Sequence, residues 1–384
     1  MFTHIMRKEP MAPMKKIQSL IKKEIVTTIA LIIAILSAFI IPPDEKYAEY
    51  VDFRVLALLF CLMLIVKAFQ EMGLFDLLIN QLFKKVASLR FLVLLHILIC
   101  FFSSMLITND VALITFVPFA MLSLRLCRQE NQIIRVVVLQ TIAANLGSMC
   151  TPIGNPQNLY LFSVSGMSLV NFFKATLPIT ILSLFLLILS VLMFPPVRIT
   201  MDVKMEQKKI PVKDMIIYSI LFGINLLVVF RVLSWIPALI ITVLGVLILH
   251  QFKLFAKVDY ALLLSFVGFF IFVGNLGRIP AISELLKQLI EGREILLSVV
   301  CSQFLSNVPA AILLSEFTNK YEYLIQGINI GGLGTLIASM ASLISYKLYA
   351  GRKGAKKGAY LLTFTGYSCA FLAVLLTFCS LIQK

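Results

Sequence analysis

Charged residues are scarce in this chain of 384 residues. They make up 14% of the sequence, against about 25% in a soluble domain, while hydrophobic residues make up 60%. So apolar a composition excludes a water-soluble fold of this size and predicts an all-α integral membrane protein. Apolar stretches of the length that a membrane crossing needs cover residues 24–41, 53–72, 91–124, 132–150, 172–194, 214–231, 232–249, 258–276, 295–317, 322–345 and 360–381.

The chain also lacks the residue clusters that enzymes and metal sites use. Its seven cysteines stand singly in apolar surroundings, without a Cys-x-x-Cys pair or a histidine spacing that suits zinc. No glycine-rich phosphate loop is present, and no nucleophile-base pair or carboxylate dyad recurs among the apolar segments. We therefore expect no enzyme activity and no cofactor, and an ion gradient of Na+ or H+ as the source of energy.

The formal net charge is +15, which in a soluble protein would suggest a nucleic-acid partner. Here the basic residues lie in short loops between apolar segments, where the orientation of the chain in the lipid bilayer explains them. Most of the 34 Lys and Arg residues fall on the cytoplasmic side when the basic N-terminus is placed there. The sequence thus predicts no nucleic-acid partner and a multi-pass protein of the cell (plasma) membrane, with a cytoplasmic N-terminus and an external C-terminus.

The apolar stretch 91–124 is too long for one helix and is broken at its middle by Thr108-Asn109-Asp110. Basic residues flank it on both sides, so both of its ends should lie in the cytoplasm. A re-entrant hairpin with Asn109 at its tip satisfies this rule. Two full crossings would satisfy it too, but each arm has only about 16 or 17 residues, at the lower limit for spanning, and the hairpin is therefore favoured.

A second broken stretch, 295–317, carries Ser306-Asn307 at its centre, and its mixed-charge flanks suit a hairpin entered from the external side. An interrupted helix follows each hairpin. The aligned positions in these two helices are Asn145 with Asn329, Gly147 with Gly331 and Thr151 with Thr335. Because one half starts inside and the other outside, the sequence predicts two inverted repeats containing about 9 transmembrane helices and two re-entrant hairpins.

This organisation divides the chain into four parts. They are a cytoplasmic N-terminal segment (1–23), a first repeat (24–194), a basic cytoplasmic linker with a linking helix (195–231) and a second repeat (232–384). Helix breaks inside a bilayer expose helix N-termini, which attract anions, and unwound carbonyl groups, which attract small cations. The breaks therefore point to a site that holds an anion together with Na+.

Two polar residues of the first hairpin need separate interpretation. Asp110 places a carboxylate within an apolar segment, where such a group is usually a proton carrier or a cation ligand. Alternatively, Asp110 is a helix N-cap at the hairpin tip. His96 lies among apolar neighbours on one arm, where a hydrogen-bonded packing role is favoured over a proton relay.

The paired tips and breaks resemble the citrate transporter-like branch of the ion transporter superfamily, which includes divalent-anion/sodium symporters and arsenite permeases. The resemblance extends from about residue 24 to residue 381 and implies an elevator motion and a homodimer. It implies that the substrate-binding residues are Thr108, Asn109, Ser306, Asn307, Gln157 and Asn158. The implied Na+ ligands are Thr151, Gly154 and Asn155 at one break and Thr335, Ala338 and Ser339 at the other, and Asp110 joins them as a candidate through its charge.

The sequence departs from the symporter motif at Asp110 and Val308, where that motif has Thr. A negative charge beside an anion site favours proton coupling or a less charged substrate. The leading hypothesis is a secondary active transporter of a small anion, either a carboxylate or an inorganic oxyanion, coupled to Na+ or H+. The alternatives are an arsenite-type efflux permease or a Na+/H+ antiporter using Asp110. A channel or a scaffold subunit is disfavoured because both tips are paired.

Overall fold

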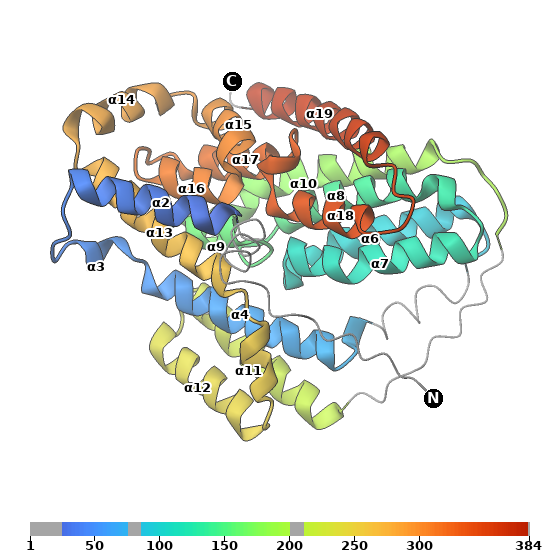
Figure 1. The fold of residues 1–384 in the computed structure, drawn as a ribbon, viewed down its shortest axis with the longest axis horizontal. Coiled ribbons are helices and arrows are strands. Elements are labelled where there is room, and N and C mark those ends of the chain that lie inside the picture. The colour runs from blue at the N-terminus through green and yellow to red at the C-terminus, as the bar shows by residue number, and fades with distance from the viewer. Residues whose placement is uncertain (1–24, 76–85, 200–210, 383–384) are drawn as a thin grey trace, which may run out of the picture. The chain divides into compact units, whose positions relative to one another are not determined.

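The computed structural model describes residues 25–75, 86–199 and 211–382 (Figure 1). These residues form helices joined by turns, and no strand occurs among them, which confirms the predicted all-α class. The α-helices are α2 (Ile25–Ile40), α3 (Tyr47–Tyr50), α4 (Phe53–Glu71), α6 (Leu89–Ile107), α7 (Asn109–Leu126), α8 (Ile133–Ser148), α9 (Pro156–Ser165), α10 (Leu169–Leu192), α11 (Val212–Val229), α12 (Trp235–Ile248), α13 (Tyr260–Gly277), α14 (Pro280–Ile290), α15 (Glu294–Leu305), α16 (Asn307–Ser315), α17 (Tyr321–Gly331), α18 (Met340–Ala350) and α19 (Lys357–Ile382). Short 3-10 helices are η1 (Glu130–Gln132), η2 (Phe252–Lys257) and η3 (Leu336–Ala338).

Seven of the described helices are long and apolar enough to cross a membrane: α4, α6, α7, α10, α11, α13 and α19. A helix satisfies its own backbone hydrogen bonds, which is why apolar runs adopt this form where no water is available. Large apolar side chains also face outward, as on α10, where Ile181 and Phe185 are both exposed. Such side chains suit contact with lipid, and the chain is an all-α integral membrane protein.

The first broken stretch folds as two helices that meet at Thr108. α6 begins at Leu89 and has 19 residues, while α7 continues to Leu126 and has 18. Both arms are therefore longer than the sequence suggested, and each reaches spanning length. Length does not favour a re-entrant hairpin over two crossings here, so that choice stays a prediction. In stretch 295–317, by contrast, α15 has 12 residues and α16 has 9, too few to cross.

Both interrupted helices are broken where the sequence predicts. α8 ends at Ser148 and α9 begins at Pro156. α17 ends at Gly331, and η3 precedes the start of α18 at Met340. The segment 278–294, for which no helix was expected, contains α14, whose apolar side chains recur at helical spacing.

The chain divides into two compact units, one of Met1–Asp52 and Asp259–Ile279 and the other of Phe53–Val258 and Pro280–Lys384. In the first unit α2 packs along α13. A Cβ on Gly268 would lie 2.9 Å from the Ala30 carbonyl oxygen, so the glycine permits this close approach.

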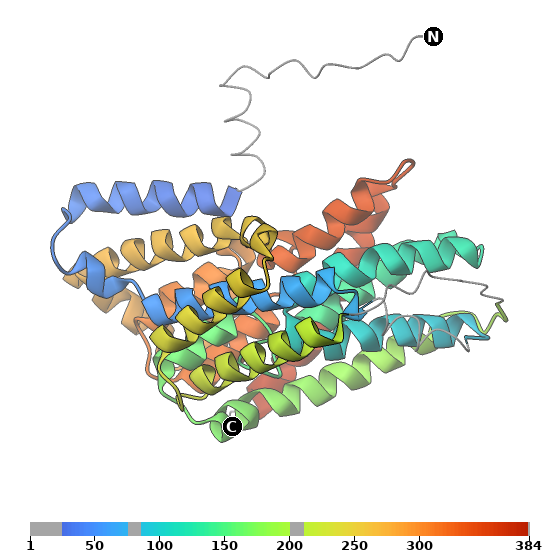
Figure 2. The same ribbon diagram turned by 90° about the horizontal axis from the view of Figure 1, so that it is seen from below.

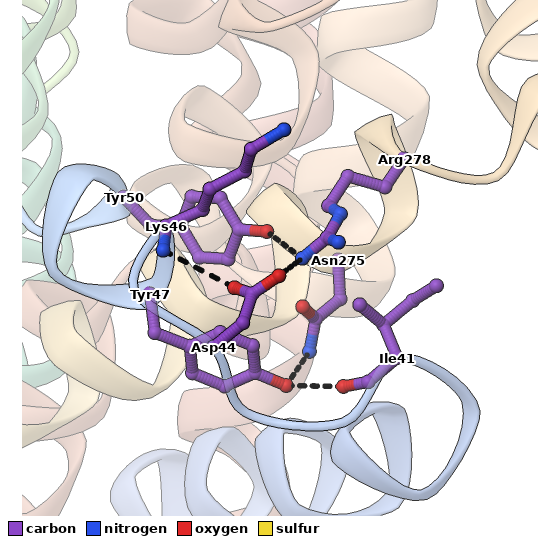
Figure 3. Close-up of polar contacts among 7 residues, drawn as sticks. All are labelled: Ile41, Asp44, Lys46, Tyr47, Tyr50, Asn275 and Arg278. Atoms are coloured by element: carbon purple, nitrogen blue, oxygen red, sulfur yellow. Dashed lines mark hydrogen bonds and ion pairs between the residues drawn. The ribbon is translucent and has the colours of Figure 1, made fainter.

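A polar cluster closes the same unit at the end of α13 (Figure 3). The Asn275 amide donates to the hydroxyl of Tyr47 at 2.8 Å, and that hydroxyl donates to the Ile41 carbonyl at 2.5 Å. Arg278 lies 3.1 Å from the Tyr50 hydroxyl and 2.8 Å from an Asp44 carboxylate oxygen. Hydrogen bonds to Tyr50 and then to Asp44 raise the pKa of the Arg278 guanidinium. The turn after α2 is thereby held to α13.

In the second unit each hairpin packs against the interrupted helix of its own half and against that of the other half. α6 contacts α8 and α15 contacts α17, while α7 contacts α18 and α16 contacts α9. Figures 1 and 2 show α6, α8 and α10 side by side, in teal to light green. The halves of the sequence thus interlock around the two breaks.

Some predicted segments lie outside the described residues. They are the N-terminal segment 1–23 and most of the basic stretch that opens the linker 195–231. The two compact units do not follow the predicted repeats, because each repeat contributes helices to both, and this division does not test the repeat boundaries.

Candidate functional site

The two hairpin tips share one backbone conformation. Thr108 has φ 69° and ψ 149°, and Ser306 has φ 74° and ψ 155°. A residue with a Cβ is strained in this region by about 1–3 kcal/mol, and such residues cluster at ligand sites. Directly after each tip an asparagine begins a helix, Asn109 in α7 and Asn307 in α16. Both tips therefore present a hydroxyl residue, a strained backbone and a helix-starting asparagine in the same order.

Asn109 is 4% exposed and contacts both the first break and the helix before it. Its backbone N–H donates to the Gly154 carbonyl at 3.1 Å, and its side-chain amide donates to Asn145 Oδ1 at 3.2 Å. Its own Oδ1 accepts the backbone N–H of Asp110 at 3.0 Å. The predicted Na+ ligand Gly154 thus lies directly against the predicted substrate ligand Asn109.

Asp110 is the second residue of α7 and is half-buried. Thr108, not Asp110, occupies the N-cap position, so the N-cap interpretation of Asp110 is wrong. A carboxylate in the first turn is still favourably placed for the positive end of the helix dipole. The charge of Asp110 therefore lies in the first turn of α7, two residues after the N-cap Thr108.

The first break is held together by its own side chains. Asn155 caps α9 by accepting the backbone N–H of Asn158 at 2.8 Å. The side-chain amide of Asn158 donates to the carbonyls of Met149 and Thr151, both at 3.2 Å. Because unwound carbonyls are costly without a donor, this amide stabilises the break. Gln157 lies beside Asn158 in the first turn of α9 and is also buried.

The second break is held by a residue that the sequence did not single out. The side-chain amide of Gln303, on α15, donates to the carbonyls of Gly331 at 2.9 Å and Leu333 at 3.0 Å. Its Oε1 accepts the backbone N–H of Thr335 at 2.8 Å. A lone glutamine in an apolar arm, three residues before the tip, was the available signal.

The carbonyl of Ala338 and the side chain of Ser339 lie at the end of the second break, and both residues are buried. The hydroxyl of Ser306 lies 3.5 Å from the Ala338 carbonyl and 3.5 Å from Asn307 Oδ1. Thr335, by contrast, is exposed. The second tip and the second break are thus adjacent, as the first tip and first break are.

Two asparagines join the halves through matched contacts. Asn145 Oδ1 accepts the Ser339 hydroxyl at 3.0 Å, and the Asn145 amide donates to the Ser342 hydroxyl at 3.3 Å. Asn329 Oδ1 accepts the Asn155 amide at 3.1 Å, and the Asn329 amide donates to Asn158 Oδ1 at 2.6 Å. In each case the partners lie ten and thirteen positions after the corresponding asparagine of their own half. The same contact is made twice, once in each direction between the halves.

Close packing at two glycines supports this arrangement. A Cβ on Gly147 would overlap the Phe101 carbonyl oxygen, and one on Gly331 would lie 2.8 Å from the Ser302 hydroxyl oxygen. Each broken helix therefore approaches the first arm of its hairpin, α6 or α15, at a glycine. Membrane helices commonly approach one another closely at small residues.

The central polar cluster comprises the tip residue Thr108 and the residues that these contacts join, which are Asn109, Asn145, Thr151, Gly154, Asn155, Asn158, Ser306, Asn307, Asn329, Ala338 and Ser339. Of the 13 predicted site residues only Asp110 is ionisable. The N-caps Thr108, Ser306 and Ser339 form no side-chain cap hydrogen bond, although the first two N–H groups of α7 already donate to Gly154 and Asn109. A helix N-terminus without a side-chain cap attracts anions. In the described part of the chain no group of three or more His, Cys, Asp or Glu residues could hold a metal ion.

His96 lies on α6, twelve residues before the tip residue Thr108. It is fully buried, its Nε2 lies 2.7 Å from the Ser123 hydroxyl oxygen, and its ring packs against Phe119. The prediction of a hydrogen-bonded packing histidine is confirmed.

Comparison with known proteins places this fold in a family. The sequence matches the citrate transporter family over residues 17–320. It is 34% identical to an uncharacterised transporter of Methanocaldococcus jannaschii, over 81% of this chain and 85% of the relative. It is 31% identical to inner membrane protein YbiR of Escherichia coli, over 83% and 86%, and 31% identical to a silicon efflux transporter of Oryza sativa, over 36% and 28%. The chain therefore belongs to the citrate transporter family and is a multi-pass membrane protein of the secondary transporter class.

Proposed function

We propose that the protein is an ion-coupled secondary active transporter that binds a small anion, a carboxylate or an inorganic oxyanion, at the central polar cluster. The observation that carries this proposal is the pair of matched contacts that Asn145 and Asn329 make to the opposite half. They connect both helix breaks through buried hydrogen bonds at the interface of two related halves, which is where transporter sites lie. These contacts also support two inverted repeats.

Asn109 and Asn307 are the substrate ligands of the proposal, with Thr108 and Ser306 beside them. Both asparagines are 4% exposed and start a helix, so an amide donor and a helix N-terminus occur together at each tip. This combination suits an anion, because side-chain amides and helix N-termini are both sources of N–H donors. It also suits a substrate of low charge, since no Lys or Arg is among the proposed ligands.

The coupling cation would bind between each tip and its break. The carbonyls of Gly154 and Ala338 and the hydroxyls of Thr151, Thr335 and Ser339 are the oxygen ligands that Na+ prefers. Gln157 remains a proposed substrate ligand. We assign Asn158 a framework role instead, because its amide already donates to two carbonyls of the break and its Oδ1 accepts from Asn329.

Three further expectations belong to the same proposal. They are location in the plasma membrane, a cytoplasmic N-terminus with an external C-terminus, and a homodimer that moves its hairpins by an elevator motion. The basic loops support the orientation.

Ligand-induced thermal stabilisation of the purified protein tests the proposal, because specific binding raises apparent stability by mass action. Small carboxylates and inorganic oxyanions are compared, each with and without Na+ at two pH values. An anion-dependent rise in melting temperature that requires Na+ or low pH supports the symporter. A response to Na+ or pH alone, with no anion effect, contradicts it.

Asp110 favours a second candidate, an efflux permease or a Na+/H+ antiporter. Asp110 is half-buried and its backbone N–H donates to Asn109, and one relative is named a silicon efflux transporter. Resistance of expressing cells to arsenite or to alkaline sodium stress, lost in Asp110→Asn, would support efflux over uptake.

A further inference from the structure

Gln303 occupies a special position in the second half of the site. It lies on the last turn of α15, three residues before the tip residue Ser306. Its side-chain amide donates to the carbonyls of Gly331 and Leu333, and its Oε1 accepts the backbone N–H of Thr335. One side chain thus satisfies three backbone groups of the unwound segment.

The main chain at Gln303 adds a fourth bond, because the Thr335 hydroxyl donates to the Gln303 carbonyl at 3.2 Å. Gly334 has φ +97°, and a Cβ there would overlap Gln303 Oε1. The break therefore takes its path over the glutamine side chain, and only glycine fits at the closest point. The unwound segment after α17 and the hairpin arm α15 are therefore bonded to each other.

In the first half, the carbonyls of the helix break receive their side-chain donor from a different element. The residue three positions before its tip is Met105, whose thioether cannot donate a hydrogen bond. The carbonyls of Met149 and Thr151 in the first break receive their side-chain donor from Asn158, which belongs to α9, the helix that follows the break. The side chain that donates to the first break thus comes from the following helix, whereas the one that donates to the second break comes from the hairpin.

We propose that Gln303 is a positioning residue that shapes the second break and sets the affinity of the cation site formed there. This inference rests on the proposed function, since it assumes that Thr335, Ala338 and Ser339 bind the coupling cation. Gln303 acts through the carbonyls and the amide that it fixes and does not itself contact the ion. The two cation sites then differ, because only in the second does a side chain of the hairpin arm donate to the carbonyls of the break.

The variant Gln303→Met tests the positioning role, since it keeps an unbranched side chain and supplies the residue found at position 105. The first measurement is hydrogen–deuterium exchange of the purified full chain. Loss of the acceptor for the Thr335 amide should speed exchange about tenfold in the peptide covering 331–338 and leave 148–155 unchanged. Met105→Leu is the matched control and should change neither peptide. Unchanged exchange at 331–338 in Gln303→Met overturns the proposal.

The second measurement uses Na+ as the probe. Its readout is uptake into proteoliposomes of the anion that stabilises the wild-type protein most in the thermal assay. The Na+ concentration for half-maximal rate should rise about tenfold in Gln303→Met, while the maximal rate and the substrate KM at saturating Na+ stay within about twofold of wild type. If the transport rate falls by the same factor at every Na+ concentration, and the Na+ concentration for half-maximal rate is unchanged, Gln303 has only a structural role and the proposal is overturned.

The outcomes separate this inference from the proposed function. If the transport rate of the wild-type protein does not depend on Na+, the proposed cation site is contradicted and the inference loses its basis. A wild-type response to Na+ that Gln303→Met leaves unchanged overturns the inference alone. If Gln303→Met does not fold, Gln303→Asn keeps the neutral amide and shortens the side chain by one methylene group, which withdraws both donor and acceptor from the break. A raised Na+ requirement in that variant supports the proposal, and an unchanged requirement overturns it.

Discussion

Thr151 and Thr335 make the same hydrogen bond in the two halves of the chain. The hydroxyl of Thr151 donates to the carbonyl of Met105, and the hydroxyl of Thr335 donates to the carbonyl of Gln303. Met105 and Gln303 each stand three residues before a hairpin tip. Each helix break is therefore bonded to the first arm of its hairpin, α6 or α15, at an equivalent point. This bond sets the distance between tip and break.

Replacing either threonine by valine should lower stability, because valine keeps the shape of the side chain and removes the donor. We expect each change to reduce the free energy of unfolding by about 0.5–1.5 kcal/mol. The two changes should add within about 0.5 kcal/mol, because the two hydrogen bonds share no partner. Thermal unfolding of the purified variants measures this. Thr363→Val, on an exposed face of α19, is the control and should have little effect. A strongly non-additive double variant would contradict the independence of the two bonds.

Alanine at either tip asparagine should strongly reduce substrate transport at a fixed, low substrate concentration. Asn109→Ala removes an amide that already binds Asn145, and Asn307→Ala removes the matching group of the second tip. Loss of one hydrogen bond to a charged ligand is worth about 1.5–3 kcal/mol, which lowers the apparent affinity tenfold or more. Uptake into proteoliposomes is the measurement, and Asn171→Ala on exposed α10 surface is the control. Wild-type uptake in both tip variants would remove these asparagines from the site.

The sequence predicts the positions of the tips and breaks because polar and helix-breaking residues inside an apolar run have few explanations. Asn109, Asn307 and the two breaks were located for this reason. The arm lengths of the first hairpin were underestimated because Arg90 and Arg125 were counted as flanks, although long basic side chains extend from a helix end into water.

The roles of Gln303 and Asn329 could not be predicted from the sequence, for a different reason. Each side chain acts through partners roughly 30 or more residues away, Gln303 on Gly331 and Leu333 and Asn329 on Asn155 and Asn158. A hydrogen bond between distant segments leaves no local pattern, and only the alignment of the halves marked Asn329.

Alanine at three glycines should have graded effects. Gly147→Ala should be the most destabilising, by about 1–3 kcal/mol, because its Cβ would overlap backbone atoms of Phe101 that cannot move alone. Gly331→Ala should cost less, since its new methyl group meets the side chain of Ser302 at 2.8 Å. Gly223→Ala is the control, because a Cβ there has no neighbour within 4 Å and α11 should gain about 0.5–1 kcal/mol. Melting temperatures in the reverse order would contradict the close packing at Gly147.

Asp110→Asn separates the two candidate functions. If the carboxylate helps to bind Na+, its removal should raise the Na+ concentration for half-maximal transport about tenfold, which corresponds to about 1.4 kcal/mol. This is a modest fraction of the roughly 4 kcal/mol that two unit charges gain at 4 Å under an effective dielectric constant of 20. Asp214→Asn is the matched control, because Asp214 also lies in the first turn of a helix but accepts from Gln251 outside the cluster. An unchanged Na+ requirement together with a lost dependence on pH would assign Asp110 to proton transfer, because a group that carries a proton must titrate, and the antiporter would then be the better description.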